Sequence, residues 1–154
     1  MNDAVPRATA EAFYAAYNSR DVDRIAAYLA DDVVWNVYGP PEVMQVCGQW
    51  RGKAAVIDRF ARVIPRIIET ARIDTDCLLV DGDHSALFGR VTSKQRPSGR
   101  TISHRCGHFV TWRGGKIVSF RVINDGLDAV EQYIGHRIDL SADMDARESD
   151  IVAI

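Results

Sequence analysis

The sequence predicts an α+β domain in which a curved antiparallel sheet, with helices on one side, forms a cone around a pocket. The first observation is the order of the elements, because four strand-like runs follow one another after three helical segments and one strand. The second is the stretch of residues 99–125, where two strand-like runs flank the tight turn RGGK. The third is the length of 154 residues, which is typical of one domain that buries its own core.

The chain begins with two predicted helices. Residues 8–18 are rich in helix formers, and their apolar side chains fall on one helical stripe: Ala10, Phe13, Tyr14 and Tyr17. Asp21 is a suitable N-cap, because its carboxylate can accept hydrogen bonds from the first free amides of a helix. A second helix is therefore predicted from Val22 to Leu29.

A strand and a covering connection follow the second helix. Residues 33–38 are mostly β-branched or aromatic and predict a strand. The segment GPP at residues 39–41 must then turn or loop. Residues 42–51 form a connection whose apolar side chains are too many for a solvated loop, so we expect it to cover part of the core.

The second half of the chain is predicted to be mostly strand. A third helix repeats apolar residues with helical period over residues 53–64, and Pro65 either ends it or kinks an extra turn that reaches Ile68. Strands are then predicted over residues 71–80 and 85–93, separated by the turn Asp81-Gly82-Asp83. The hairpin within residues 99–125 supplies two more strands.

The end of the chain is predicted to form a short helix and a tail. Asp125 is the expected N-cap of a helix over residues 127–134, and Asp128 or Glu131 lies near its positive end. Residues 135–154 are acidic and lack periodicity, so we expect a tail that is loose or packs on a neighbour.

The first arm of the hairpin has the character of a pocket wall. Side chains alternate between the two faces of a strand, and one face collects His104, Cys106, His108, Val110 and Trp112. This face changes from polar to apolar along the strand, as the wall of a ligand pocket does. The opposite face would carry Arg105 and Phe109.

Composition argues against several classes of partner. A formal net charge of −2 provides no electrostatic basis for binding nucleic acid or an anionic membrane. No run approaches the roughly 18 apolar residues of a membrane span. Cys47, Cys77 and Cys106 are an odd set without metal-ligand spacing, which favours reduced thiols. We therefore expect a cytoplasmic protein.

Several short patterns occur in order along the chain. They are Asn18-x-x-Asp21-x-Asp23, ADDVVW at residues 30–35, GPPE at 39–42, Gly48-x-x-x-Gly52 with Val56 and Phe60, Gly99-Arg100, Gly115-Lys116-Ile117 and Asp125. In this order and spacing they resemble the SnoaL-like polyketide cyclases and ketosteroid isomerases of the nuclear-transport-factor-2-like superfamily. The resemblance covers residues 8–134 and implies the cone-shaped fold of that superfamily. These are framework motifs that do not identify a reaction.

The resemblance also indicates which catalytic groups are missing. Ketosteroid isomerases polarise a carbonyl with a tyrosine and a protonated aspartic acid, while a second aspartate moves the proton. Aligned on the motifs, the base position falls near Val37, which cannot accept a proton. The tyrosine position falls near Phe13, with Tyr14 adjacent, and the acid position falls near Gly107 or His108. The isomerase set is therefore mostly absent.

The candidate catalytic residues are His108, His104 and Asp125. The two histidines share a strand face and could act in acid–base chemistry or hydrogen bonding to substrate, or could be hydrogen-bonded wall residues. The resemblance to SnoaL-like cyclases implies that Asp125 is a pocket acid. Its place before a helix, as an N-cap, is a sufficient structural reason for an aspartate at this position. With Arg90 it is a fragment of the Asp–Arg–Asp set that a limonene-epoxide-hydrolase mechanism needs.

The candidate ligand-binding residues are Phe13, Tyr14, Tyr17, Trp35, Phe60, Trp112 and Asn124. Core packing is the alternative interpretation for most of the aromatic members. No metal and no cofactor is expected, because His104, Cys106 and His108 alternate on one face without a visible fourth ligand.

These features favour a small enzyme that carries out cofactor-independent proton transfer, such as isomerisation, cyclisation or hydration, on an apolar cyclic metabolite. The alternative is a non-catalytic ligand-binding dimer that uses the same pocket. The resemblance implies a homodimer through the outer face of the sheet, where Phe109 and Ile123 would be exposed apolar groups. A monomer whose residues 136–154 fold over that face is the other interpretation.

Overall fold

A computed structural model describes residues 4–139 and 141. Its strands are β1 (Leu29–Val37), β2 (Gly48–Arg51), β3 (Ile68–Asp81), β4 (His84–Gln95), β5 (Thr101–Arg113) and β6 (Lys116–Asn124). Its helical elements are α1 (Arg7–Ser19), α2 (Val22–Ala26), α3 (Lys53–Asp58), the π-helical turn η1 (Arg59–Val63), α4 (Ile64–Ile67) and α5 (Gly126–Ile134). Within the described residues, the six strands form one sheet in the order β2-β1-β6-β5-β4-β3.

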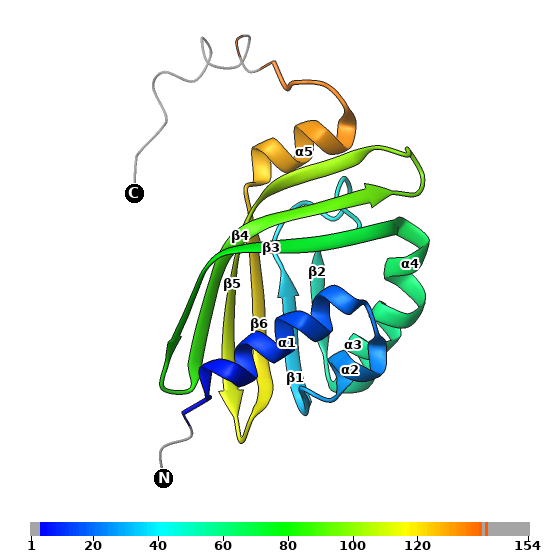
Figure 1. Ribbon diagram of the computed structural model, residues 1–154. Helices are drawn as coiled ribbons and strands as arrows, with labels where there is room; N and C mark the ends of the chain where they lie inside the picture. Colours follow the sequence, from blue (N-terminus) through cyan, green and yellow to red (C-terminus); the bar gives the residue numbers. More distant parts are fainter. Residues whose placement is uncertain (1–3, 140, 142–154) are drawn as a thin grey trace, which may run out of the picture.

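The predicted α+β cone is confirmed, with one detail corrected. Every strand pair is antiparallel except β1 with β6, which run parallel. Figure 1 shows a curved sheet whose concave side is crossed by α1, with α2 to α4 beside it and α5 at one end. The hairpin β5–β6 thus lies at the centre of the sheet, where both of its edges pair with other strands.

The first strand begins earlier than predicted. The helix predicted from Val22 to Leu29 ends at Ala26, and β1 begins at Leu29. Leu29 is buried and lies opposite Ile117 of β6, so pairing with a central strand outweighs local helix propensity. The connection at 42–51 contains the short edge strand β2, which was not predicted. Met44 and Cys47 of this connection are buried, which confirms the prediction that the connection covers part of the core.

The third helical segment is continuous but not uniformly α-helical. It runs from Lys53 through the π-helical turn η1 to Ile67, as expected for a segment that continues past Pro65. A π-helical turn accommodates one more residue than an α-helical turn. Val56, Phe60 and Ile64, which are four residues apart and share one helical stripe, all line the same cavity.

The predicted alternation of the hairpin is confirmed on β5. His104, Cys106 and His108 are buried, while Arg105 and Phe109 are exposed on the opposite face. On β6 the register shifts near the turn, where Trp112 lies opposite Ile117. Because of this β-bulge, Ile117 takes the buried position that strict alternation predicts for Val118.

The last described helix closes one end of the cone. The side chain of Asp125 accepts a hydrogen bond from the amide of Asp128 at 3.5 Å, which confirms it as the N-cap of α5. Ala129 of α5 packs with Met44 and Cys47 of the covering connection. The predicted acidic tail falls largely on residues 140 and 142–154, which lie outside the described residues.

Replacing Gly89 by alanine is expected to lower the free energy of unfolding by about 1–3 kcal/mol. A Cβ at this position would lie 2.3 Å from the carbonyl oxygen of Asp74, and a backbone atom within a paired strand cannot move aside. Urea denaturation of Gly89→Ala measures the loss. Gly107→Ala on β5 is the matched control, because its Cβ would meet its nearest neighbour at 3.6 Å. Equal losses in the two variants would contradict this explanation.

Candidate functional site

A cavity of about 100 Å³ lies between the concave face of the sheet and the helical elements. Its wall is built from α1, β1, the segment α3–η1–α4, strands β3 to β6, the covering connection and Tyr133 of α5. An engineered cavity of about 150 Å³ in another protein holds one benzene molecule. This cavity therefore suits a ligand of about one ring.

The cavity brings together six of the predicted site residues and leaves out four. The six that line it are Tyr17, Trp35, Phe60, His104, His108 and Asn124. The four outside the lining are Phe13, Tyr14, Trp112 and Asp125. The hairpin register, which determines the inward face, therefore placed both histidines correctly.

The four residues outside the lining are used in packing or capping. Phe13 is fully buried in edge contacts with the rings of Trp112 and Phe120. The indole Nε1 of Trp112 donates a hydrogen bond to Ser85 Oγ at 2.9 Å. Trp112 lies deeper than the cavity because β5 continues past it into the core, and Phe13 of α1 packs against Trp112 there. Tyr14 stacks on His108 from behind, with ring centroids 5.8 Å apart. Asp125 caps α5.

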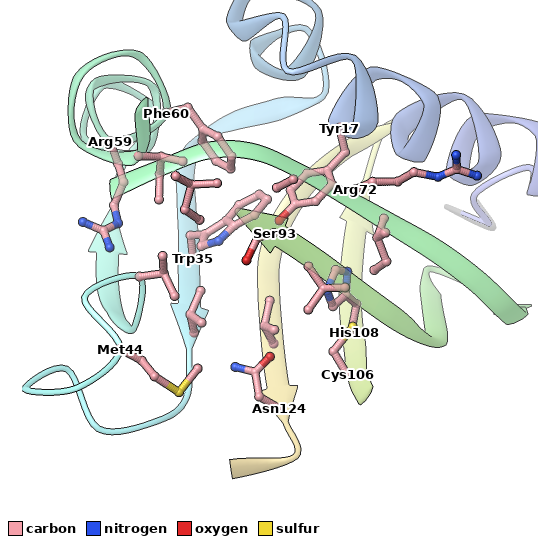
Figure 2. A pocket seen from close by; sticks show the side chains of 18 of the residues that line it. Tyr17, Trp35, Met44, Arg59, Phe60, Arg72, Ser93, Cys106, His108 and Asn124 are labelled. Carbon is pink, nitrogen blue, oxygen red and sulfur yellow. The ribbon is translucent and has the colours of Figure 1, made fainter. Parts of the chain in front are cut away.

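An aromatic stack forms one wall of the cavity. Trp35 of β1 and Phe120 of β6 lie opposite each other on the parallel strand pair, with centroids 3.8 Å apart and planes 9° apart. Phe60 meets Trp35 edge-on at 5.3 Å, and the ring of Tyr17 is stacked 6.3 Å from it. Figure 2 shows Trp35 between Phe60 and Tyr17 in the pocket. Together these aromatic side chains offer an apolar wall to the ring of a ligand.

His108 is a neutral hydrogen-bonding group in this wall. Burial lowers the pKa of His108 from 6.5 to about 3, so the imidazole is uncharged at neutral pH. Its Nδ1 is buried without a hydrogen-bond partner in the described chain. A buried lone pair without a partner is less costly than a buried N–H without one, so the proton belongs on Nε2. Nε2–H is then a donor for a ligand in the cavity.

His104 has the opposite arrangement. Its Nδ1 lies 3.1 Å from the carbonyl oxygen of Arg105. A carbonyl oxygen can only accept a hydrogen bond, so Nδ1 carries the proton and its N–H group donates to this oxygen. In the neutral imidazole, Nε2 then holds the free lone pair. His104 therefore presents an oriented proton acceptor, and the same strand presents a proton donor at His108.

Two further polar groups lie toward the α5 end of the cavity. The buried hydroxyl of Ser93 accepts a hydrogen bond from Gln95 Nε2 at 3.0 Å. The amide of Asn124 donates to the carbonyl oxygen of Tyr38 at 3.2 Å, which leaves its own oxygen unpaired in the described chain. The cavity thus has a polar end, but the apolar end predicted for the hairpin face, Val110 and Trp112, lies outside its lining.

The family model of the SnoaL-like domain matches residues 10–120, which is more than half of the chain. The chain belongs to the SnoaL-like domain family. None of the curated proteins compared with it matches.

Solved structures of the same fold extend this assignment. A provisionally assigned isomerase from Rhodopseudomonas palustris is 28% identical over 82% of this chain and 93% of its own, with a TM-score of 0.68. An NTF2-like protein from Burkholderia thailandensis is 25% identical over 82% of this chain and 95% of its own, with a TM-score of 0.69. An LEH-like epoxide hydrolase of M. tuberculosis is 19% identical over 83% of this chain and 88% of its own, with a TM-score of 0.68. This likeness concerns the fold alone.

Catalytic sets of related enzymes are not assembled in this SnoaL-like domain. Arg90 lies opposite Arg105 in the strand ladder, shares its outer face and donates to the carbonyl of Ser103 at 3.2 Å. Neither Arg90 nor Asp125 lines the cavity, so the epoxide-hydrolase fragment does not form there. Val37, at the isomerase base position, does line the cavity but has no proton acceptor.

Some lining residues of this SnoaL-like domain were not singled out in the sequence. Ser93 was predicted to end a strand, and continued alternation from Val91 would have placed it inward. Arg59 precedes Phe60, so an ideal helix would turn it away from the apolar stripe. Tyr133 was predicted only as part of a helix, and no local pattern brings α5 to the cavity. Within the described residues, no helix is both long and apolar enough to span a membrane, and no three His, Cys, Asp or Glu side chains gather as metal ligands.

We expect His108 alone to make the folded domain about 2 kcal/mol less stable at pH 5 than at pH 7. Because the pKa of His108 is lowered to about 3, the unfolded chain binds a proton in this window and the folded chain does not. The contribution of the neutral His108 to stability is therefore present above about pH 6.5 and is lost as the pH falls toward 3. Urea denaturation at both pH values measures it.

The test compares variants, because other groups also titrate. His108→Leu should lack about 2 kcal/mol of the wild-type change between pH 7 and pH 5. His136→Gln removes an exposed imidazole and is the matched control, which should keep the wild-type change. If His108→Leu and wild type change equally, the neutral state of His108 is wrong.

Proposed function

We propose that this protein is a cofactor-independent enzyme that moves a proton on a small, largely apolar cyclic carbonyl compound. The observation that carries the proposal is the complementary pair on β5, in which His104 holds a free lone pair and His108 holds a free N–H at one cavity. Proton abstraction next to a carbonyl needs one group of each kind.

The chemistry follows from the two roles. The Nε2 atom of His104 takes a proton from the carbon next to the carbonyl, and the C–H electron pair becomes the C=C bond of an enolate. The Nε2–H group of His108 donates a hydrogen bond to the carbonyl oxygen, where negative charge develops. A neutral imidazole can do this, as it does in triosephosphate isomerase. Where the ketone also carries a C=C bond one carbon further along, the enolate is a dienolate, and return of the proton to its far carbon completes an isomerisation.

The mechanism requires both histidines to reach the same end of the substrate. Their Cα atoms lie about 13 Å apart, four residues along one strand, and both side chains reach inward from there. The ring must therefore present its carbonyl end between the two imidazoles, with the α-carbon toward His104 and the oxygen toward His108. Trp35 and Phe60, whose ring planes are nearly perpendicular, supply an apolar corner for that ring. Membership in the SnoaL-like family, and the isomerase assignment of a 28% identical relative, support this class of reaction.

Deuterium exchange tests the proposal without knowledge of the natural substrate. Cyclohexanone is incubated with the protein in D2O near neutral pH, and NMR follows the loss of its α-proton signals. The expected result is exchange faster than in buffer alone, saturating with ketone concentration. Binding of cyclohexanone without faster exchange would overturn the enzyme and favour a ligand-binding protein. The lack of an Asp or Glu in the lining formed by the described residues is the observation that favours that second function.

We also propose a homodimer formed by the outer face of the sheet. Phe88, Phe109 and Ile123 are 52%, 50% and 51% exposed there, which is a large apolar content for a solvated surface. Sedimentation equilibrium at micromolar concentration should give twice the chain mass of 17.2 kDa. Phe109→Glu with Arg121→Glu should shift the mass to that of one chain, since like charges would meet across a twofold axis.

A control variant separates this surface from other exposed apolar groups. Leu127 on α5 is 52% exposed, and Leu127→Glu should leave the dimer intact. A wild-type species near 17.2 kDa would refute the dimer, as would a dimer that persists in the double glutamate variant.

A further inference from the structure

The cavity carries positive charge that the described residues balance only in part. Among the described residues that line it are Arg20, Arg59 and Arg72, but no Asp or Glu. Arg72 is balanced by Asp74, whose Oδ1 lies 2.7 Å from its Nη2. Arg20 and Arg59 have no carboxylate within 4 Å in the part of the chain that the structure describes.

Arg59 is held in place beside the aromatic wall. Its guanidinium carbon lies 3.8 Å from the centroid of the Trp50 ring, and its Nη2 donates to the carbonyl oxygen of Gln45 at 2.5 Å. A guanidinium has five N–H donors in a rigid fork, so these contacts orient the group and leave donors free. Figure 2 shows Arg59 and Phe60 on the same helical segment at the edge of the pocket.

The surroundings of Arg59 do not supply a negative charge. Burial raises the pKa of the nearby Cys47 thiol to about 11, so this thiol is neutral at physiological pH. Burial also lowers the pKa of Arg59 itself, which reflects the cost of removing its charge from water. A partly buried cation without a counterion is unfavourable unless a ligand completes the site.

The backbone at Arg59 is also unusual. Arg59 is the first residue of the π-helical turn η1, and such turns are frequent at functional sites. Arg59, Phe60 and Ile64 all line the cavity. A cation and an aromatic ring thus stand side by side on this turn, at the same opening.

We propose that the ligand of this cavity is an anion, namely a one-ring apolar carbonyl compound that carries a carboxylate bound by Arg59. Its ring lies against Trp35 and Phe60, and its carboxylate accepts paired hydrogen bonds from the free N–H groups of Arg59. This inference rests on the proposed function for the carbonyl end of the ligand. It adds the charge of the substrate and the residue that selects it.

Two probes with the same ring isolate the charge. They are 4-oxocyclohexane-1-carboxylate and its methyl ester, which differ in charge but share the ketone. Isothermal titration calorimetry at pH 7 should find that the wild-type protein binds the carboxylate at least about tenfold more tightly than the ester. This preference should shrink as salt is added, because the interaction is between charges.

Variants identify the arginine. Arg59→Met should remove the preference, because the affinity for the carboxylate should fall far more than the affinity for the ester. A thermal denaturation midpoint like that of the wild type verifies that the variant is folded. Arg72→Met is the matched control and should keep the wild-type preference, because Asp74 already balances Arg72. Arg59→Lys should keep part of the preference, since it retains the charge without the fork.

The outcomes separate the two proposals. Equal binding of both probes by wild type, or a preference that survives Arg59→Met, overturns the anion site even if both probes exchange their α-protons in D2O. A preference that depends on Arg59, without any faster exchange, supports the anion site and overturns the enzymatic proposal. Failure of both probes to bind at millimolar concentration overturns both.

Discussion

Replacing His104 by glutamine should lower the rate of α-proton exchange on cyclohexanone by about 10²–10⁴-fold, the range for loss of a general base. The carbonyl oxygen of Arg105 accepts a hydrogen bond from the Nδ1–H group of His104 and so leaves Nε2 as the proton acceptor. Glutamine retains a polar side chain of similar length but has no basic nitrogen. The exchange rate at saturating ketone should therefore fall, while the affinity for the ketone should change little.

NMR measures both quantities, because ketone titration reports affinity and loss of the α-proton signals reports exchange. His84→Gln is the matched control, because His84 is an exposed histidine at the start of β4 that does not line the cavity. It should exchange at the wild-type rate. A His104→Gln variant that keeps wild-type exchange would show that another group removes the proton.

Replacing Trp35 by alanine should lower the free energy of unfolding by about 3–5 kcal/mol, as is typical of large aromatic-to-alanine changes in cores. Trp35 is 4% exposed and stacks on Phe120 at 3.8 Å. Its loss removes both the buried apolar surface and the stack that joins β1 to β6. The same change would enlarge the cavity on the side where the ligand ring is expected.

Urea denaturation of three variants tests the importance of this stack. Trp35→Phe should lose less than Trp35→Ala, because a smaller ring can still stack on Phe120. Trp50→Ala should also lose less, since Trp50 is half-buried on the edge strand β2. If the alanine variants at positions 35 and 50 lost equal stability, Trp35 would not be a central packing residue.

Local sequence patterns determined the direction in which side chains point. The period of two along β5 placed His104 and His108 on the inward face, because that period is a property of the extended backbone itself. Asp125 was predicted as an N-cap for a similarly local reason, since its carboxylate needs only the amides that directly follow it. The order of the motifs predicted the fold because few arrangements satisfy it.

The tertiary structure decided how far each inward side chain lies from the cavity. Phe13 and Trp112 point inward but belong to the core, whereas Trp35 reaches the cavity wall. The parallel pairing of β1 with β6 is a contact between segments distant in sequence. The bulge near the β5–β6 turn and the π-helical turn at Arg59 interrupt the regular periods from which side-chain direction is predicted. Sequence periodicity specifies orientation about one element's axis, while the shape of a cavity depends on how several curved elements meet.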